Sequence, residues 1–180
     1  VMGDHGRGTC HHFGCTDDVH LIVGTFSKSL ASVGGFVASD ADTIHYIQHL
    51  ARVMIFSASP PPASVASVAA AIDVMLEENW RHEALWRNTR IMMERLQDAG
   101  FDTGPSETPI IPVVVGGDEV AYRMCVRCWE EGVFVNPIVS PAVDPGNALL
   151  RLSLMATHTE DEIHKAMDIL SSVGKELGVV

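Results

Sequence analysis

The chain has 180 residues, of which 47% are hydrophobic, and it carries 23 acidic against 12 basic side chains. This length allows one hydrophobic core or two small ones, and the formal net charge of −11 opposes contact with a phosphate backbone, so nucleic acid is not an expected partner. No apolar run is long enough for a transmembrane helix and no leader pattern is present, so we expect a cytoplasmic protein without a transmembrane segment.

The first 78 residues contain two short apolar runs followed by one helical pattern. VHLIVGTF, residues 19 to 26, is bounded by acidic and polar residues and predicts a buried strand, and GGFVAS, residues 34 to 39, predicts a second strand. Prolines then stand where a helix can begin, and the segment 59–78 predicts a buried helix. Its apolar residues at helical spacing are Val65, Val68, Ala69, Ile72, Met75 and Leu76.

The remaining residues alternate between helical and strand patterns. Residues 79–100 predict a helix with Leu85, Met92 and Leu96 on one side and Gly100 as its stop. After it we expect strands over 110–115, 133–136 and 148–155, a helix over 118–131, and a final helix opened by a capping box of Thr159 and Glu162. These elements predict a small α+β layer, and we place a domain boundary near residue 78.

Cysteines and histidines offer a metal site as one interpretation. Cys125 and Cys128 form a C-x-x-C pair, but the surrounding residues predict a helix and no second pair has matching spacing. The early histidines also lack regular helical or ribbon spacing, so we expect no metal. They are His5, His11, His12 and His20.

Lys28 lies just beyond the first predicted strand, in GTFSKSLASVGG. A lysine at the end of a buried strand is partly desolvated, which favours its neutral amine, a nucleophile toward aldehydes. The hydroxyl of Thr25 and a backbone made approachable by Gly34 and Gly35 suit a phosphate on the same ligand. The alternative interpretation of this pattern is a solvated surface lysine.

Four separated segments together resemble the α-oxoamine synthases, pyridoxal-phosphate enzymes of fold type I. They are GDHGRGTC, GTFSKSLASVGGF, FSASPPPASVAS and ALLRLSLMATHTEDEI. Within the family the resemblance is greatest to the bacterial serine palmitoyltransferase branch. It implies an α/β fold, the C-terminal part of the fold type I transferase, with residues 1–78 from the large cofactor-binding domain and 79–180 as the small C-terminal α+β domain.

The resemblance also implies roles for four residues. Lys28 matches the lysine that forms a Schiff base with pyridoxal 5'-phosphate and then transfers a proton at the substrate α-carbon. Thr25 matches a phosphate-binding hydroxyl, and Ser57 matches a position that reaches the phosphate of the neighbouring subunit, which implies a homodimer with shared active sites. Arg151 matches the arginine that holds the amino-acid carboxylate. Because Leu150 and Leu152 fix the apolar side of its strand, Arg151 is expected on the other side with Ser153.

The implied reaction is a decarboxylating condensation of an amino acid, with serine favoured, and an acyl-CoA to give an α-amino ketone. Such a role in sphingolipid biosynthesis fits a cytoplasmic enzyme, or one at the membrane periphery. Alternatives are 8-amino-7-oxononanoate synthase, glycine C-acetyltransferase, another fold-type-I enzyme such as an aminotransferase or lyase, and a non-catalytic fragment.

Two departures from the family pattern accompany these matches. The aspartate and histidines that contact the cofactor ring in the family precede GDHGRG and are not among these 180 residues, so we expect the C-terminal part of a longer enzyme. Val139 stands where some serine palmitoyltransferases have an arginine, which leaves the substrate open.

Overall fold

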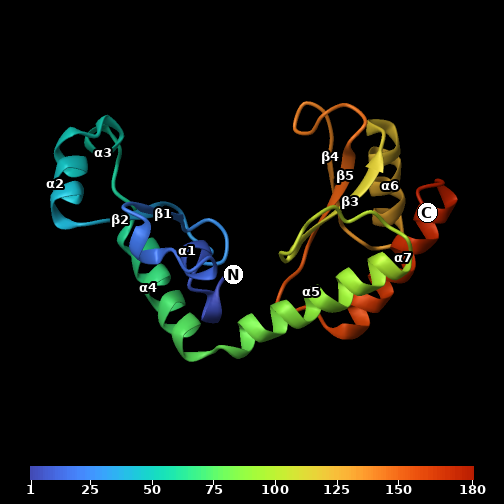
Figure 1. The fold of residues 1–180 in the computed structure, drawn as a ribbon, viewed down its shortest axis with the longest axis horizontal. Helices are drawn as coiled ribbons and strands as arrows, with labels where there is room; N and C mark the ends of the chain where they lie inside the picture. The colour runs from blue at the N-terminus through green and yellow to red at the C-terminus, as the bar shows by residue number, and fades with distance from the viewer. The chain divides into compact units, whose positions relative to one another are not determined.

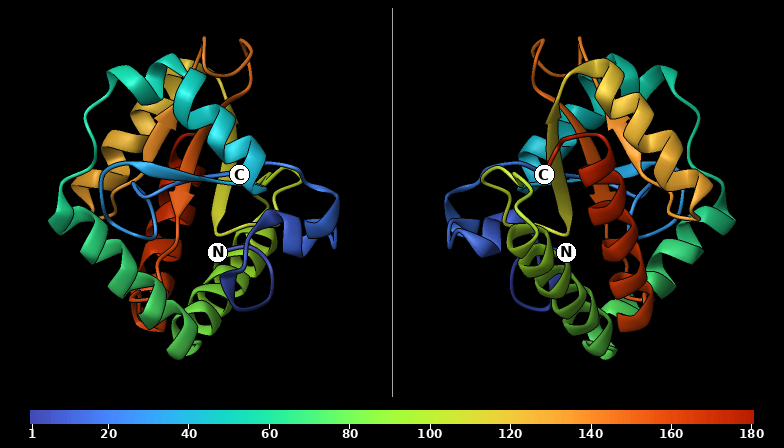
Figure 2. Two further views of the ribbon diagram at one scale, coloured as in Figure 1. Left: turned by 90° about the vertical axis from the view of Figure 1, so that its left-hand side faces the viewer. Right: turned by 90° about the vertical axis from the view of Figure 1, so that its right-hand side faces the viewer.

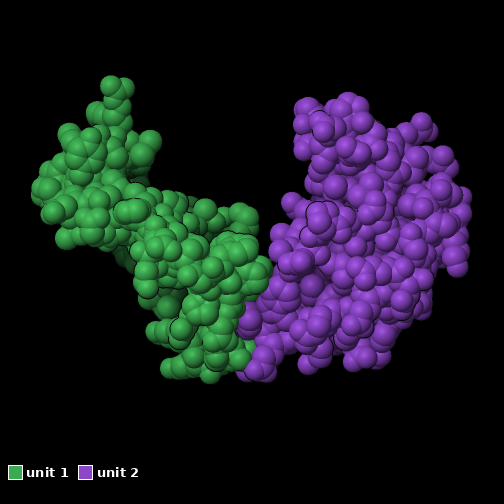
Figure 3. Space-filling view, in the orientation of Figure 1, with its two compact units in different colours: residues 1–79 green, residues 80–180 purple.

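The chain divides in the short turn between two long helices, after Asn79. A computed structural model describes residues 1–180, and these form unit 1, residues 1–79, and unit 2, residues 80–180 (Figure 3). The division lies one residue from the boundary expected near residue 78. That the two units are pieces of a large and a small domain stays a prediction.

Unit 1 consists of short helices and one two-stranded antiparallel ribbon. The ribbon pairs β1, Ile22–Thr25, with β2, Gly35–Ala38, and Thr25 lies opposite Gly35 at its end. The predicted strands and the long helix are present, but the sequence interpretation omitted a helix that begins where the Asp40 carboxylate accepts from Thr43 N–H at 2.9 Å. The elements are η1 Asp4–Gly6, α1 Thr9–His12, η2 Thr16–Asp18, β1 Ile22–Thr25, β2 Gly35–Ala38, α2 Ala41–Leu50, α3 Arg52–Phe56 and α4 Pro62–Glu77 (Figure 1).

The predicted burial of these elements is wrong for the described chain. Val68 is the one buried residue on α4, and Val23 in β1 is 66% exposed. The apolar patterns at 19–26 and 59–78 are real, but β1 pairs only with β2, and within unit 1 nothing covers either face of this ribbon enough to bury its side chains. Apolar periodicity indicates which side of an element prefers a partner; it does not supply the partner.

Unit 2 is a three-stranded antiparallel sheet with three helices. The strands are β3 Ile110–Gly116, β4 Asn136–Ile138 and β5 Ala148–Ser153. Their order in the sheet is β3-β5-β4, so the strand that carries Arg151 is central. The expected strand at 133–136 begins only at Asn136, because Val133 N–H still bonds to the Cys128 carbonyl at 2.8 Å as the chain leaves its helix. The elements are α5 Trp80–Asp98, β3 Ile110–Gly116, α6 Asp118–Glu130, β4 Asn136–Ile138, β5 Ala148–Ser153 and α7 Glu160–Glu176.

One continuous core holds unit 2 together, and it confirms the expected α+β layer. Helices α6 and α7 lie against the same face of the sheet, and α5 packs beside α7 (Figures 1 and 2). On β5 the side chains alternate, with Leu150 and Leu152 buried and Arg151 and Ser153 exposed, as predicted. Fully or nearly fully buried members of the core include Leu96, Ile111, Val113, Met124, Cys128, Leu150, Ile163, Met167 and Leu170.

The buried stripe of α5 contains one polar residue. Buried residues follow one another at four-residue spacing along α5: Ala84, Asn88, Met92 and Leu96. Asn88 is the polar one, and it has no exposed surface. The predicted stripe named Met92 and Leu96 correctly, whereas Leu85 is only half-buried. Gly100 ends this region with φ 88°, a left-handed conformation that favours glycine, as expected from its position.

The capping box that opens α7 yields a stability prediction. Thr159 Oγ1 accepts from Glu162 N–H at 3.3 Å, and the Glu162 carboxylate accepts from Thr159 N–H at 2.8 Å. We expect Thr159→Ala to lower the free energy of unfolding by about 1 kcal/mol, measured by urea denaturation. Ser172→Ala, on an exposed position of the same helix, is the control and should leave it nearly unchanged.

The same cap predicts a pH dependence. Hydrogen bonds from the Thr159 backbone and then its hydroxyl hold the pKa of Glu162 below its usual 4.5. A group whose pKa is lowered by folding stabilises the protein above its unfolded pKa and loses this effect as the pH falls through the folded value. The deficit of Thr159→Ala should therefore shrink on acidification below pH 4.5, and a deficit that grew there would contradict this role.

Candidate functional site

Lys28 is presented by a hydrogen-bonded loop that joins β1 to β2. Phe26 N–H donates to the Gly34 carbonyl at 2.9 Å, and Ser32 N–H donates back to the Phe26 carbonyl at 2.9 Å. Within the loop, Ala31 N–H donates to the Lys28 carbonyl at 2.9 Å. These bonds close the loop at its base and around Lys28, so the lysine projects from a defined turn.

The Lys28 amine itself is exposed, which corrects the expectation of a desolvated lysine. Its Nζ donates to the neighbouring Ser27 hydroxyl at 2.8 Å and has no carboxylate partner. The physical reason is the uncovered ribbon: because β1 is not buried, its end is not buried either. An amine without an ion-pair partner is nevertheless open to reaction with a carbonyl compound.

Thr25 and Ser57 are also exposed, on segments adjacent to this loop. Thr25 ends β1 opposite Gly35, where a Cβ would stand 2.5 Å from the Gly24 carbonyl, so the ribbon needs a glycine there. Ser57 directly follows α3 and makes no hydrogen bond of its own. The loop is tied to this region through Ser32 Oγ, which donates to the Ser64 carbonyl at 3.3 Å. Thr25, Lys28 and Ser57 thus belong to connected segments, and no hydrogen bond joins their side chains.

The composition of this loop fits a phosphate-bearing aldehyde. Residues 24 to 35 contain one amine and no carboxylate, so no negative charge in the loop opposes a phosphate. Hydroxyls from Thr25, Ser27 and Ser29 lie on either side of Lys28 in the sequence. The donor set is therefore suited to pyridoxal phosphate, with the amine for the aldehyde and hydroxyl and amide donors for the phosphate.

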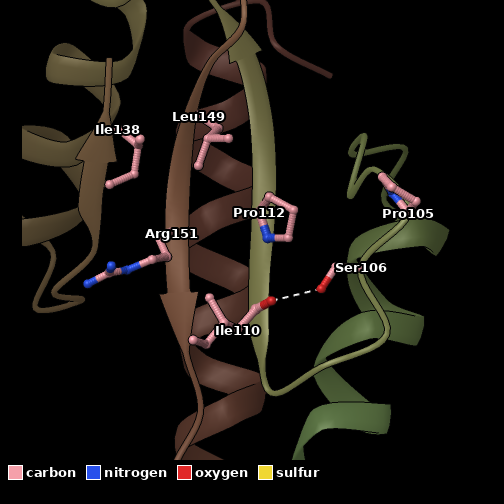
Figure 4. A pocket seen from close by; sticks show the side chains of 7 residues that line it. All are labelled: Pro105, Ser106, Ile110, Pro112, Ile138, Leu149 and Arg151. Carbon is pink, nitrogen blue, oxygen red and sulfur yellow. Dashed lines mark hydrogen bonds between the residues drawn. The ribbon is translucent and has the colours of Figure 1, made fainter. Parts of the chain in front are cut away.

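Arg151 lies on the open face of the sheet in unit 2. It pairs with Pro112 on one side and Asn136 on the other, and it is one of the residues that line a shallow hollow of about 460 Å³. Its side chain extends toward the β4 side, away from Pro112 (Figure 4). Ser106 closes one side, where its hydroxyl donates to the Ile110 carbonyl at 2.8 Å. Other residues lining the hollow are mainly apolar: Pro105, Ile110, Pro112, Ile138 and Leu149.

The Arg151 guanidinium makes no hydrogen bond or ion pair in the structure, unlike Arg95 and Arg127 on the helices. Arg95 bonds Asp168 at 2.9 Å, and Arg127 bonds Glu176 and Glu130, which raises the pKa of Arg127 above its already high usual value. A free guanidinium beside an apolar surface is suited to a ligand that combines a carboxylate with an apolar part. This is the chemistry expected of Arg151.

The C-x-x-C pair lies on α6 as predicted and serves packing. Burial raises the pKa of Cys128 to about 11 and also raises the pKa of Cys125, whose thiol donates to the Val135 carbonyl at 3.2 Å. No cluster of three or more potential metal-ligating side chains occurs in the chain. The chain also contains no helix of sufficient length and apolarity to traverse a bilayer.

Sequence reasoning missed Asn88 as a residue of interest. Its amide donates to the Met155 and His158 carbonyls, at 3.0 and 2.8 Å, in the turn that follows β5. The signal was available, because a polar residue interrupts an apolar stripe at four-residue spacing. The stripe read from the sequence was displaced by one residue, to Leu85, so the interruption was not noticed.

Comparisons with known proteins give a consistent result. The profile of the aminotransferase class I and II family matches residues 1–170. The serine palmitoyltransferase of Sphingobacterium spiritivorum is 51% identical over 176 residues, which are 98% of this chain and 44% of that protein. The 8-amino-7-oxononanoate synthase of Symbiobacterium thermophilum is 42% identical over 180 residues, all of this chain and 46% of that protein.

A solved structure of serine palmitoyltransferase with a pyridoxal phosphate internal aldimine superposes with a TM-score of 0.93 at 33% identity, over all of this chain and 46% of that one. This likeness confirms the predicted fold class, a mixed α/β part of the fold type I transferase. The chain spans less than half the length of these relatives.

Proposed function

The chain belongs to the class I and II aminotransferase family, and from this premise we propose that it is the part of a pyridoxal-phosphate-dependent α-oxoamine synthase that carries the cofactor lysine and the substrate arginine. The observation that carries the proposal is the exposed Lys28 amine, which has no ion-pair partner and lies on a loop without carboxylates. The likeness to relatives of this class supports it.

Lys28 Nζ is proposed to bond the cofactor aldehyde and later to carry a proton. When bound, pyridoxal phosphate supplies an electron sink that makes the α-proton of an amino acid removable. Lys28, released by the incoming amino acid, accepts that proton at Nζ. Its single hydrogen bond, to Ser27 Oγ, costs little to break, so the amine is free to move between the two tasks.

Thr25 and Ser57 are proposed to hold the phosphate. Thr25 Oγ1 would donate from the end of β1, on the same loop base as Lys28. Ser57 Oγ has no partner within this chain and is proposed to donate to the phosphate bound by a second subunit, so the complete site requires a homodimer. These roles come from the family resemblance, and their exposed positions are compatible with them.

Arg151 is proposed to bind the amino-acid carboxylate through the fork of its guanidinium. A bidentate contact fixes the orientation of the amino acid as well as its affinity, so the α-proton would face a base in a constant direction. The acyl donor is proposed to be an acyl-CoA thioester, which the activated α-carbon attacks with loss of CoA and carbon dioxide.

We propose a cytoplasmic location for the enzyme.

Serine is the favoured amino acid and palmitoyl-CoA the favoured donor, since the serine palmitoyltransferase relative has the higher identity, 51% against 42%. The synthase of 8-amino-7-oxononanoate is the second candidate. Val139, in the segment between β4 and β5, keeps this second candidate open, because it stands where some serine palmitoyltransferases have an arginine.

Product analysis of the full-length protein tests this proposal. Serine, glycine and alanine are each offered with palmitoyl-CoA or a short acyl-CoA, and CoA, carbon dioxide and the ketone are measured. We expect serine with palmitoyl-CoA to release CoA and carbon dioxide in equal amounts. Conversion of the amino acid without CoA release would instead identify an aminotransferase or lyase.

A further inference from the structure

Asn88 is the most completely buried polar side chain in unit 2. It has no exposed surface, and it stands in the apolar stripe of α5 between Ala84 and Met92. Its Oδ1 is buried without a hydrogen-bond partner. Burying this oxygen without a partner costs free energy, so an apolar side chain at position 88 would stabilise the core at least as well. The presence of an amide is therefore explained by the hydrogen bonds of its nitrogen.

The other end of the amide holds the exit of β5. An amide nitrogen has two hydrogens, and both are used: one is donated to the Met155 carbonyl at 3.0 Å and one to the His158 carbonyl at 2.8 Å. These carbonyls belong to a tight turn, in which His158 N–H donates to the Met155 carbonyl at 3.3 Å and Met155 N–H donates to His158 Nδ1 at 3.3 Å. One side chain on α5 thus fixes a turn 67 to 70 residues later in the chain.

This turn comes directly after the strand that presents Arg151. Leu154 N–H donates to the Pro109 carbonyl at 3.0 Å, so the end of β5 is attached to the start of β3 on one side and to α5 through Asn88 on the other. Arg151 lies four residues before Met155, on the outward face of this strand. Strand β4 pairs with β5 only as far as Arg151, so the residues after Arg151 are held by β3 and by the Asn88 contact. Without that contact only β3 would hold them, and the direction of the Arg151 side chain would vary more.

We infer that Asn88 is a positioning residue for Arg151: it fixes the exit of β5 so that the guanidinium meets the substrate carboxylate in one orientation. This inference rests on the proposed function of Arg151. A buried asparagine can have either a structural role or a positioning role, and the two have different kinetic consequences. A purely structural role lowers the amount of folded enzyme and hence the apparent kcat, whereas a positioning role raises the KM for the amino acid in the enzyme that does fold.

A double-mutant cycle in the full-length enzyme tests the inference. We expect Asn88→Ala to raise the KM for serine about tenfold, since the Met155 and His158 carbonyls lose the donor that α5 supplies and the strand end loosens. Arg151→Ala should raise it more, and the double variant should match Arg151→Ala alone, because Asn88 acts only through Arg151. The KM for the acyl-CoA should change little in Asn88→Ala.

Thr89→Val is the matched control. Thr89 is also buried, at 4% exposure, on the same helix, but its hydroxyl donates within the helix to the Leu85 carbonyl at 2.8 Å. It should lose stability with little change in the KM for serine. If Asn88→Ala does not accumulate as folded protein, Asn88→Ser, which keeps one donor, takes its place in the cycle.

The outcomes distinguish this inference from the proposed function beneath it. If Arg151→Ala raises the KM for serine while Asn88→Ala leaves it unchanged, or if the two effects multiply in the double variant, Asn88 does not position Arg151. If Arg151→Ala itself leaves the KM unchanged, the proposed role of Arg151 fails, and the inference falls with it.

Discussion

Replacing Lys28 by alanine is expected to lower the condensation rate of the full-length enzyme on the order of a thousandfold, because one amine both bonds the cofactor and moves the substrate proton. Binding of the amino acid should be less affected, since the proposed carboxylate contact is on Arg151. The rate is measured as CoA release from palmitoyl-CoA and serine. Lys165→Ala and Lys175→Ala, which alter the two other lysines of the chain, should retain normal rates.

Reduction with borohydride tests the covalent bond directly. Trypsin cannot cleave after a modified lysine, so a cofactor bonded to Lys28 should yield the uncut peptide of residues 8–52, between Arg7 and Arg52, with the added mass. Unmodified protein should instead be cut at Lys28. Recovery of the adduct on Lys165 or Lys175, or undiminished labelling of Lys28→Ala, would overturn the assignment.

Replacing Arg151 by alanine is expected to raise the KM for the amino acid on the order of a hundredfold, since a pair of charge-assisted hydrogen bonds to a carboxylate is lost. The cofactor spectrum and the KM for the acyl-CoA should change little. Arg151→Lys should recover part of the loss, because an ammonium supplies the charge without the fork. Steady-state kinetics with serine as the varied substrate provide the measurement.

Ser153→Ala is the control for this prediction. Ser153 is exposed on the same face of β5, two residues along, and its loss should leave the KM for serine unchanged. An equal decline of amino-acid and cofactor affinity in Arg151→Ala would show that the arginine supports the fold. Affinity for glycine and alanine should fall in parallel with serine, because all three share the carboxylate.

The secondary structure of unit 2 was predictable because its patterns are local. The Thr159 and Glu162 cap, the Gly100 stop and the alternation around Leu150 each express a preference within a few residues, and the structure agrees with all of them. Helix α2 was missed although Asp40 is a good cap, because its histidines and tyrosine gave no clear apolar stripe. The strand at 133–136 was placed too early because Val133 to Val135 are apolar but leave α6 through a turn.

The burial of the site was not predictable from the sequence. A run such as VHLIVGTF shows that a strand favours an apolar environment, but whether Lys28 at its end is desolvated depends on what covers the ribbon. The face of Arg151 followed from period-two alternation, whereas the hollow beside it arises from residues some forty positions earlier, such as Ser106 and Pro112. The spacing of α5 marks Asn88 as a polar residue in an apolar stripe, but its contact with Met155 is a property of the fold that local spacing does not give.

Buried and outward-facing side chains alternate along β5, so neighbouring positions on this strand are under different evolutionary constraints. Leu150 and Leu152 face the core, and any change there affects folding. Leu149 and Arg151 line the hollow on the opposite face, so we expect substitutions at these positions to alter the proposed substrate contact with little effect on the core. Under the proposed role of Arg151, we expect changes in substrate preference to arise at positions 149 and 151 while positions 150 and 152 keep the core intact.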